Sequence, residues 1–153
     1  MKVEVIDRLL RNEKGASLIE LALMLPILIL LVTAGADVAS GFSAKIALQQ
    51  ATARTIEKAT AGGLNSGAFQ ILQAEGAAAA GVNENQVTVD KWLECNGLRQ
   101  SDFNGVCADS QQVARYVSIN INSSYTPIFT FFKLATVQDG KIPLTSTSSV
   151  RVQ

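Results

Sequence analysis

Two cysteines and one carboxylate are the residues whose type and position could do chemistry in this chain. Cys95 and Cys107 are the only cysteines, and the chain contains no histidine. A zinc site needs a larger set of cysteine or histidine ligands, and the usual general base at neutral pH is a histidine. The carboxylate is that of Glu20, which lies inside a long apolar segment. We therefore expect no enzyme activity, no metal and no cofactor.

The positions of the cysteines predict a disulfide if the chain is exported. Cys95 and Cys107 flank a polar loop, and oxidising compartments favour a disulfide over two thiols. A bridge that closes a loop of this size stabilises a protein by about 3 kcal/mol in loop-entropy models. Two free buried thiols are the alternative.

The balance of charges excludes one class of partner. The chain has 13 Lys and Arg residues against 13 Asp and Glu residues, whereas nucleic-acid binding needs a concentrated positive surface. A Ser-x-x-Lys motif, which could replace histidine in a hydrolase, does not occur after residue 36. We expect neither nucleic acid nor a small-molecule substrate as a partner.

Residues 16–36 form an apolar segment that predicts a transmembrane helix. Of its 21 residues 16 are apolar, and Glu20 is the only charged one. As a helix the segment would extend about 31 Å, close to the hydrocarbon thickness of a bilayer. Four Lys and Arg residues precede it within residues 1–15, and one, Lys45, follows within the next fifteen. The positive-inside rule then places the N-terminus in the cytoplasm and everything after Asp37 outside.

A secretory signal peptide is the alternative for the same segment. The sequence Ala34-Gly35-Ala36 matches a cleavage pattern behind an apolar run. Two features argue against it, because Glu20 interrupts the apolar region and the helical pattern continues beyond Ala36. Pro26 is compatible with a membrane helix, which tolerates the lost hydrogen bond.

The junction from Lys14 to Glu20 resembles the processing site of type IV pilin-like precursors. A short charged leader ends in Gly15, a small residue, Ala16, follows, and a glutamate stands at the fifth position after the glycine. The resemblance implies that a membrane-embedded prepilin peptidase cuts between Gly15 and Ala16. It also implies that Glu20 meets the free amine of Ala16 in a neighbouring subunit. The alternatives are a glycine that breaks the helix near the bilayer edge and a glutamate that extends to the cytoplasmic interface.

Beyond the apolar segment, one long helix is expected to continue as an amphipathic stalk over residues 37–61. The apolar residues near one face of this stalk are Val38, Phe42, Ile46, Ala53 and Ile56. Residues 62–67 contain a glycine cluster that ends the helix as a short linker. Residues 66–80 then predict a second helix with Gly81 as its stop.

After Gly81 the apolar period changes to two, which predicts strands. The candidate strands are residues 86–94, 112–122 and 144–152. They indicate an α+β fold in which a small antiparallel sheet of about three strands packs against the stalk helix. Trp92 is expected in the core of this pilin-like domain.

Five parts of the chain follow from these assignments. They are a cytoplasmic leader (1–15), a transmembrane helix (16–36), an amphipathic stalk helix (37–61), a linker (62–67) and an exported α+β domain (68–153).

Aromatic residues gather between Tyr125 and Phe132. Four of the nine aromatic residues of the chain lie within these eight positions, and Pro127 argues against a central strand. One interpretation is an apolar loop that contacts the membrane or a partner. The residues of that contact would be Tyr125, Pro127, Phe129, Phe131 and Phe132. The other interpretation is that the segment caps the core of the sheet.

Taken together, these features resemble the TadE-like proteins, which are minor pilins or pseudopilins of the bacterial tight-adherence (Flp pilus) system. The resemblance rests on the leader ending NEKG, on the segment ASLIELALMLPILILL, and on the tail YVSININSSYTPIFTFF followed by PLTSTSSVRVQ. It implies a non-enzymatic, single-pass protein of the bacterial inner membrane. Its N-terminus would be cytoplasmic, and its C-terminal domain periplasmic or extracellular.

The resemblance also implies a role in the assembly of adhesive pili. The implied partners are a prepilin peptidase, other pilins or pseudopilins, the inner-membrane pilus assembly platform and membrane lipid. The alternative is a single-pass membrane-anchored periplasmic binding module that is not assembled into a pilus and captures a ligand through its aromatic loop.

Overall fold

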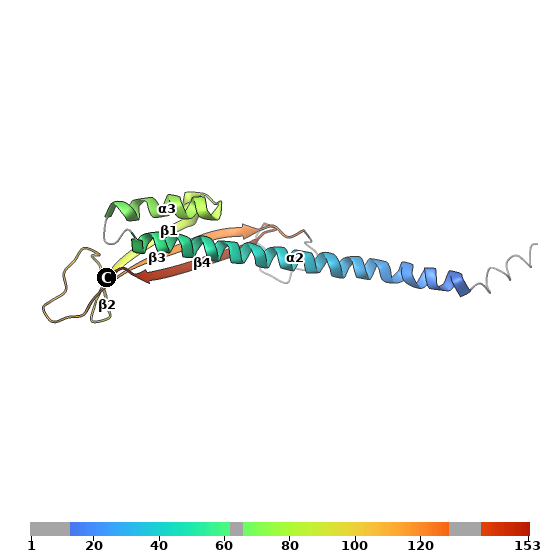
Figure 1. Ribbon diagram of the computed structural model, residues 1–153, viewed down its shortest axis with the longest axis horizontal. Helices are drawn as coiled ribbons and strands as arrows, with labels where there is room; N and C mark the ends of the chain where they lie inside the picture. The colour runs from blue at the N-terminus through green and yellow to red at the C-terminus, as the bar shows by residue number, and fades with distance from the viewer. Residues whose placement is uncertain (1–12, 62–65, 129–138) are drawn as a thin grey trace, which may run out of the picture. The chain divides into compact units, whose positions relative to one another are not determined.

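The computed structural model describes residues 13–61, 66–128 and 139–153. The chain divides into two compact units, Met1–Ala39 and Ser40–Gln153. Helix α2 (Glu13–Ala61) begins in the first unit and ends in the second (Figure 1).

Helix α2 is continuous through both predicted helical segments and ends directly before the predicted linker. Gly15 lies within its first turns, so the interpretation of this glycine as a helix breaker is wrong. Pro26 lies inside the helix. The hydroxyl of Thr33 donates to the carbonyls of Ile29 (2.7 Å) and Leu30 (3.0 Å), which satisfies a polar group that an apolar environment would otherwise leave unpaired.

In the second unit α2 buries one face. Its buried residues are Leu48, Ala51, Thr52, Thr55, Ile56 and Ala59. This face differs from the apolar face read from the sequence, because Phe42 is 67% exposed, Ile46 is 39% exposed, and of the five apolar residues only Ile56 is buried.

Threonines explain this difference. Thr52 and Thr55 are 1% and 2% exposed, although their hydroxyls appear polar in a sequence pattern. Each hydroxyl donates to the carbonyl four residues earlier, that of Leu48 (2.9 Å) or Ala51 (2.8 Å). Because the hydroxyls are satisfied within the helix, the methyl groups can pack in the core without leaving an unpaired polar atom.

Helix α3 (Ser66–Ala80) has the bounds predicted from the sequence. Gly81 follows it with φ at 65°, in the left-handed region that favours glycine. The N–H groups of Gly81 and Val82 donate to the carbonyls of Ala78 (3.4 Å) and Ala77 (3.0 Å). These two bonds form a Schellman motif, which ends the helix as predicted.

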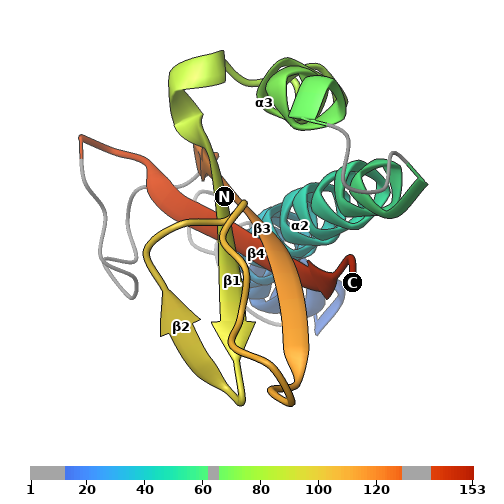
Figure 2. The same cartoon turned by 90° about the vertical axis from the view of Figure 1, so that its left-hand side faces the viewer.

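Four strands follow and form one antiparallel sheet in the order β2-β1-β3-β4 (Figures 1 and 2). A 3-10 turn, η1 (Glu84–Gln86), leads into the first of them. The strands are β1 (Val87–Cys95), β2 (Leu98–Gln100), β3 (Val113–Tyr125) and β4 (Ile142–Arg151). The predicted α+β class, with a long helix, a short helix and an antiparallel sheet, is confirmed.

Two features of the sheet were not predicted. Strand β2 lies within the loop between the cysteines, and all three of its residues are exposed, so it has no apolar alternation. Strand β3 extends to Tyr125 rather than ending at residue 122. Its last residues are polar, but they still pair with β4, as Asn122 does with Thr145, whose hydroxyl donates to the Asn122 amide oxygen (3.0 Å).

The core of the second unit lies between one face of the sheet and the two helices (Figure 2). The central strand β3 supplies Val117, Ile119 and Ile121, all 0% exposed. The remaining buried apolar core consists of Leu48, Ile56 and Ala59 from α2, Phe69, Leu72 and Ala77 from α3, Val87 from β1, and Phe103.

Strand β4 is at the edge of the sheet, and two devices protect part of that edge. The N–H of Val152 donates to the carbonyl of Arg115 (2.8 Å), so the backbone of Val152 faces β3. In an antiparallel pair every second residue faces the partner strand. The backbone groups of Thr145, an odd number of residues away, therefore face away from β3. The Lys45 ammonium, on α2, donates to this outward carbonyl of Thr145. Pro143, two residues before Thr145, also turns its backbone away from β3, and as a proline it has no N–H that would be left unpaired there.

Helix α3 packs closely at Gly76. A Cβ atom there would lie 3.2 Å from Val87 Cγ1, 3.5 Å from Thr55 Cγ2 and 3.6 Å from Ile121 Cδ1. These contacts leave no room for a larger side chain.

We expect Gly76→Leu to lower the free energy of unfolding by about 1–3 kcal/mol, because overpacking forces neighbouring side chains out of their rotamers. The matched control, Ala78→Leu, changes an exposed residue of the same helix and should shift stability by less than about 0.5 kcal/mol. Urea unfolding of the detergent-solubilised chain, followed through the fluorescence of Trp92, the only tryptophan, measures both. Equal losses for the two variants would contradict the close packing at Gly76.

Candidate functional site

The first half of α2 presents apolar side chains on all sides. From Leu18 to Val32 its large apolar residues are between 48% (Leu25) and 71% (Val32) exposed. Among the described residues, one helix is long and apolar enough to cross a membrane, and it is this one. A helix that is apolar all round needs an apolar environment, which is consistent with a single membrane anchor.

Glu20 carries the only charge of this apolar stretch. It lies between Ile19 (65% exposed) and Leu21 (54% exposed) and is itself exposed. Within the part of the chain that the structure describes, no basic side chain pairs with it. An ionised carboxylate in such a place is costly without a partner. Gly15 and Ala16, the predicted processing pair, lie one turn earlier in the same helix.

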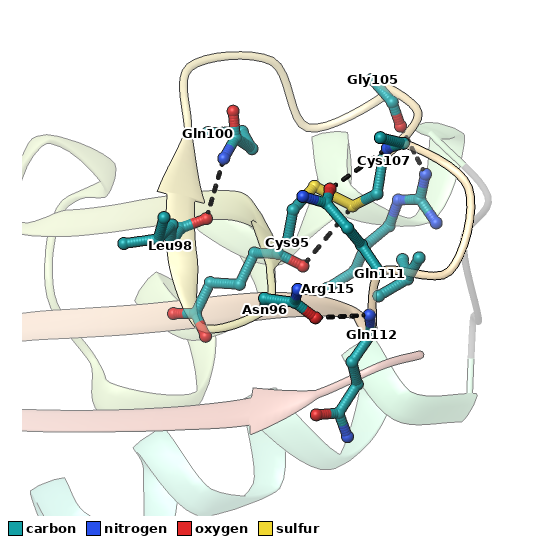
Figure 3. Close-up of a disulfide and its surroundings, with 12 residues drawn as sticks. Cys95, Asn96, Leu98, Gln100, Gly105, Cys107, Gln111, Gln112 and Arg115 are labelled. Atoms are coloured by element: carbon teal, nitrogen blue, oxygen red, sulfur yellow. Dashed lines mark hydrogen bonds between the residues drawn. A yellow bond between two sulfur atoms is a disulfide. The ribbon is translucent and has the colours of Figure 1, made fainter.

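The disulfide loop is the second candidate site. Cys95 and Cys107 are bonded to each other, with their Cα atoms 5.6 Å apart, as Figure 3 shows. Cys95 is the last residue of β1, and the loop holds β2 and the segment up to Cys107. At the base of the loop Asn96 N donates to the Gln112 carbonyl (2.9 Å), and Gln112 N donates to Asn96 Oδ1 (2.8 Å).

Arg115, which was not singled out in the sequence, holds this loop from the neighbouring strand. Its Nε donates to the carbonyl of Phe103 (3.0 Å), and its Nη2 donates to the carbonyl of Gly105 (2.9 Å; Figure 3). Its own backbone pairs with residues of the tail, since its N–H donates to the Gln153 carbonyl (3.1 Å). The half-buried Arg115 therefore joins the loop to β3 and to the residues after β4.

The inner side of the loop contributes to the core. Phe103 is 8% exposed, and its ring meets that of Phe69 on α3 edge to face, with centroids 5.6 Å apart. The Lys91 ammonium lies 5.6 Å from the Phe69 centroid and 5.4 Å from the Phe103 centroid, within cation–π range. The sequence pattern did not predict this contact. Lys91 stands at a position of β1 where the alternation predicts an inward apolar side chain, and nothing in the sequence indicates that two aromatic rings lie beside it.

Trp92 lies on the sheet face opposite the core, which corrects the expectation that it is a core residue. It is half-buried and stacks on Tyr116 of β3, with centroids 5.3 Å apart. The guanidinium of Arg99 lies 4.6 Å from the centroid of its ring, and its Nε1 donates to Glu94 Oε1 (2.8 Å). The Trp92 ring is thus in contact with side chains of its own sheet.

The aromatic segment is described only in part. Tyr125 is half-buried at the end of β3, and its Cε1 lies 3.3 Å from where a Cβ of Gly41 would be. Pro127 is half-buried, and Ile128 is 69% exposed. The predicted contact residues Phe129, Phe131 and Phe132 lie outside the described residues.

Metal ligands do not cluster in the described part of the chain, where no group of three or more Cys, Asp or Glu side chains could hold an ion. The candidate features among the described residues are a disulfide-closed loop with the arginine that holds it and, in the other unit, an apolar helical segment with one carboxylate.

We expect Arg115→Ala to lower the free energy of unfolding by about 1–3 kcal/mol, because two half-buried carbonyls of the loop lose a charged donor. The matched control is Arg54→Ala, an exposed arginine of α2, which should cost less than about 0.5 kcal/mol. Urea unfolding monitored by Trp92 fluorescence measures both. If Arg115→Ala cost no more than the control, the assigned role of Arg115 would be wrong.

A comparison with known proteins identifies a family domain in part of this chain. A family model described as TadE-like protein matches residues 15–56. No curated protein and no solved structure matches the chain. The matched residues begin at Gly15, include Glu20 and the whole apolar segment, and end at Ile56 in the buried face of α2. The chain therefore carries a TadE-like family domain at residues 15–56.

Proposed function

We propose that this chain is a minor pilin or pseudopilin that takes part in the assembly of Flp-type (tight adherence) pili. The observation that carries the proposal is the exposed apolar helix with a single carboxylate, Glu20, inside the TadE-like domain. TadE-like proteins are generally non-enzymatic and pilin-like, and this agrees with a chain that has no histidine.

The apolar helix supports an assembly role because its exposed apolar side chains need lipid or other apolar helices around them. Its side chains from Leu18 to Val32 are not covered by the described residues, and each buried apolar side chain contributes about 1.5–3 kcal/mol. In the precursor the cover is lipid of the inner membrane, with the N-terminus in the cytoplasm and the sheet domain on the exported side. In an assembly the cover is the apolar helices of other pilins or pseudopilins.

Glu20 gives this helix a specific contact. After cleavage between Gly15 and Ala16 by a prepilin peptidase, the new amine of Ala16 carries a positive charge one turn from the carboxylate of its own chain. In an apolar environment such a pair attracts strongly, and an unpaired partner is costly. A helix whose Glu20 meets the Ala16 amine of a neighbour is therefore fixed in register against it. The inner-membrane assembly platform is the place at which such helices meet.

Mass spectrometry of the mature N-terminus tests the processing step. We expect the membrane-extracted chain to begin at Ala16, because the leader ends in Gly15 at the start of α2. A chain that begins at Asp37 is a secreted protein cut by a signal peptidase, and one that begins at Met1 is a plain anchored protein. Either of these results contradicts cleavage at Gly15.

Glu20→Ala tests the assembly contact. We expect the variant to insert in the membrane as the wild type does but to be lost from the sheared pilus fraction, because removal of one partner of a buried charge pair costs about 3–5 kcal/mol. Glu57→Ala, at an exposed position of the same helix, is the matched control and should assemble normally. A membrane-anchored binding module that never joins a pilus would be unaffected by either substitution. If the Glu20→Ala variant assembled normally, the proposed contact between Glu20 and the Ala16 amine would be wrong.

A further inference from the structure

Phe42 marks the level at which α2 leaves the bilayer. Asp37 is the first charged residue after Glu20, and Phe42 lies five residues beyond it, about 7.5 Å along the helix axis. The headgroup layer on each side of the hydrocarbon is about 5–8 Å thick. When residues 17–36 fill the hydrocarbon core, Phe42 lies six residues, about 9 Å, beyond Ala36, at the outer edge of the headgroup layer.

The ring of Phe42 has little cover from the described residues. It is 67% exposed, and Ile46, one turn later, is 39% exposed. The other side of the same turns is occupied, because Gly41 contacts Tyr125 and the Lys45 ammonium donates to the Thr145 carbonyl. The domain thus packs on one side of these turns and leaves an apolar side open.

One end of the sheet lies at this same level of α2. The Tyr125 ring approaches the position of a Gly41 Cβ to 3.3 Å, and Tyr125 pairs with Ile142, the first residue of β4. Ile128, three residues after Tyr125, is 69% exposed. This end of the sheet therefore carries an exposed apolar side chain near the turn of α2 that holds Phe42.

We propose that Phe42, Tyr125 and Ile128 form a membrane rim that rests in the headgroup layer of the leaflet on the exported side. The occupant is lipid, because the rim continues the apolar surface of a helix that enters the bilayer and because aromatic rings favour headgroup level. The charges nearest in sequence to the described rim residues cancel in number, with Asp37 and Asp139 against Lys45 and Lys141, so we expect the contact to be apolar and to need no anionic lipid.

The rim fixes the height of the exported domain above the bilayer. An extraction of the chain into a pilus would then have to remove Phe42, Tyr125 and Ile128 from lipid as well as the apolar helix. The inference depends on the membrane anchor and orientation of the proposed function. It does not depend on cleavage at Gly15 or on the pilus.

The experiment uses single tryptophan reporters in the full chain, reconstituted in phosphatidylcholine vesicles. Trp92→Phe removes the only native tryptophan, and Phe42→Trp or Ile128→Trp introduces the reporter. Val32→Trp, 71% exposed in the span, reports insertion. Gln49→Trp, exposed two turns beyond Phe42 on the same side of α2, is the control for height. The quenchers are a headgroup nitroxide and acyl-chain bromines.

We expect the headgroup quencher to reduce the emission of the Phe42 and Ile128 reporters about twofold more than that of the Gln49 reporter. The acyl-chain quencher should act mainly on Val32→Trp. The same result with purely zwitterionic lipid and at high salt supports an apolar contact. If Trp92→Phe disturbs the fold, difference spectra against the wild type give the same comparison.

Three results would overturn the rim. A Phe42 or Ile128 reporter quenched no more than Gln49→Trp, while Val32→Trp is quenched, places that residue above the lipid. Quenching that disappears as the protein-to-lipid ratio is raised means that a second copy covers the rim. Absence of acyl-chain quenching at Val32→Trp removes the membrane anchor itself, and with it the proposed function.

Discussion

One helix that must satisfy two environments is the constraint on which the rest of this structure depends. The first half of α2 is apolar on all sides, a surface that is consistent with a bilayer around a single helix. From Gly41 onward the helix packs one face on the sheet, so its buried and exposed faces differ. Alanines and internally bonded threonines form much of that buried face, beside Leu48 and Ile56. One of these threonines, Thr55, meets α3 and the sheet at Gly76. The same helix is therefore apolar on all sides in its first half, which is consistent with a membrane anchor, and supplies part of the core in its second half.

The loop between Cys95 and Cys107, in the second unit, is stabilised by other interactions. The core is small, so the loop after β1 is tied down by a disulfide, by the side chain of Arg115 and by Phe103, which packs into the core. Covalent closure limits the unfolded state, whereas Arg115 supplies donors to carbonyls that would otherwise be unpaired. Both act on a region far along the chain from Glu20. The apolar stretch that contains Glu20 and the interactions that stabilise this loop are thus separate along the chain.

Sequence patterns predicted the elements well and the faces less well. The bounds of α3, the end of α2 at Ala61 and the antiparallel sheet followed from breakers and from a change of apolar period. The buried face of α2 did not, because satisfied threonines resemble solvent-facing residues in a pattern. Arg115 was missed for a similar reason, since its partners are backbone carbonyls, which leave no trace in side-chain types. Glu20 stands out in the sequence because a carboxylate within an apolar run is costly, and its assembly contact stays a prediction.

The bond between Lys45 and the carbonyl of Thr145 joins residues 100 positions apart. For a chain that crosses a membrane with its N-terminus retained, Lys45 emerges early and β4 among the last residues. Strand β3, the centre of the sheet, has neighbours on both sides only when β4 is present. Contacts of such long range also form slowly. In a chain translocated in this way, the sheet domain would complete its fold only when translocation is nearly finished, with the first half of the helix still in the membrane.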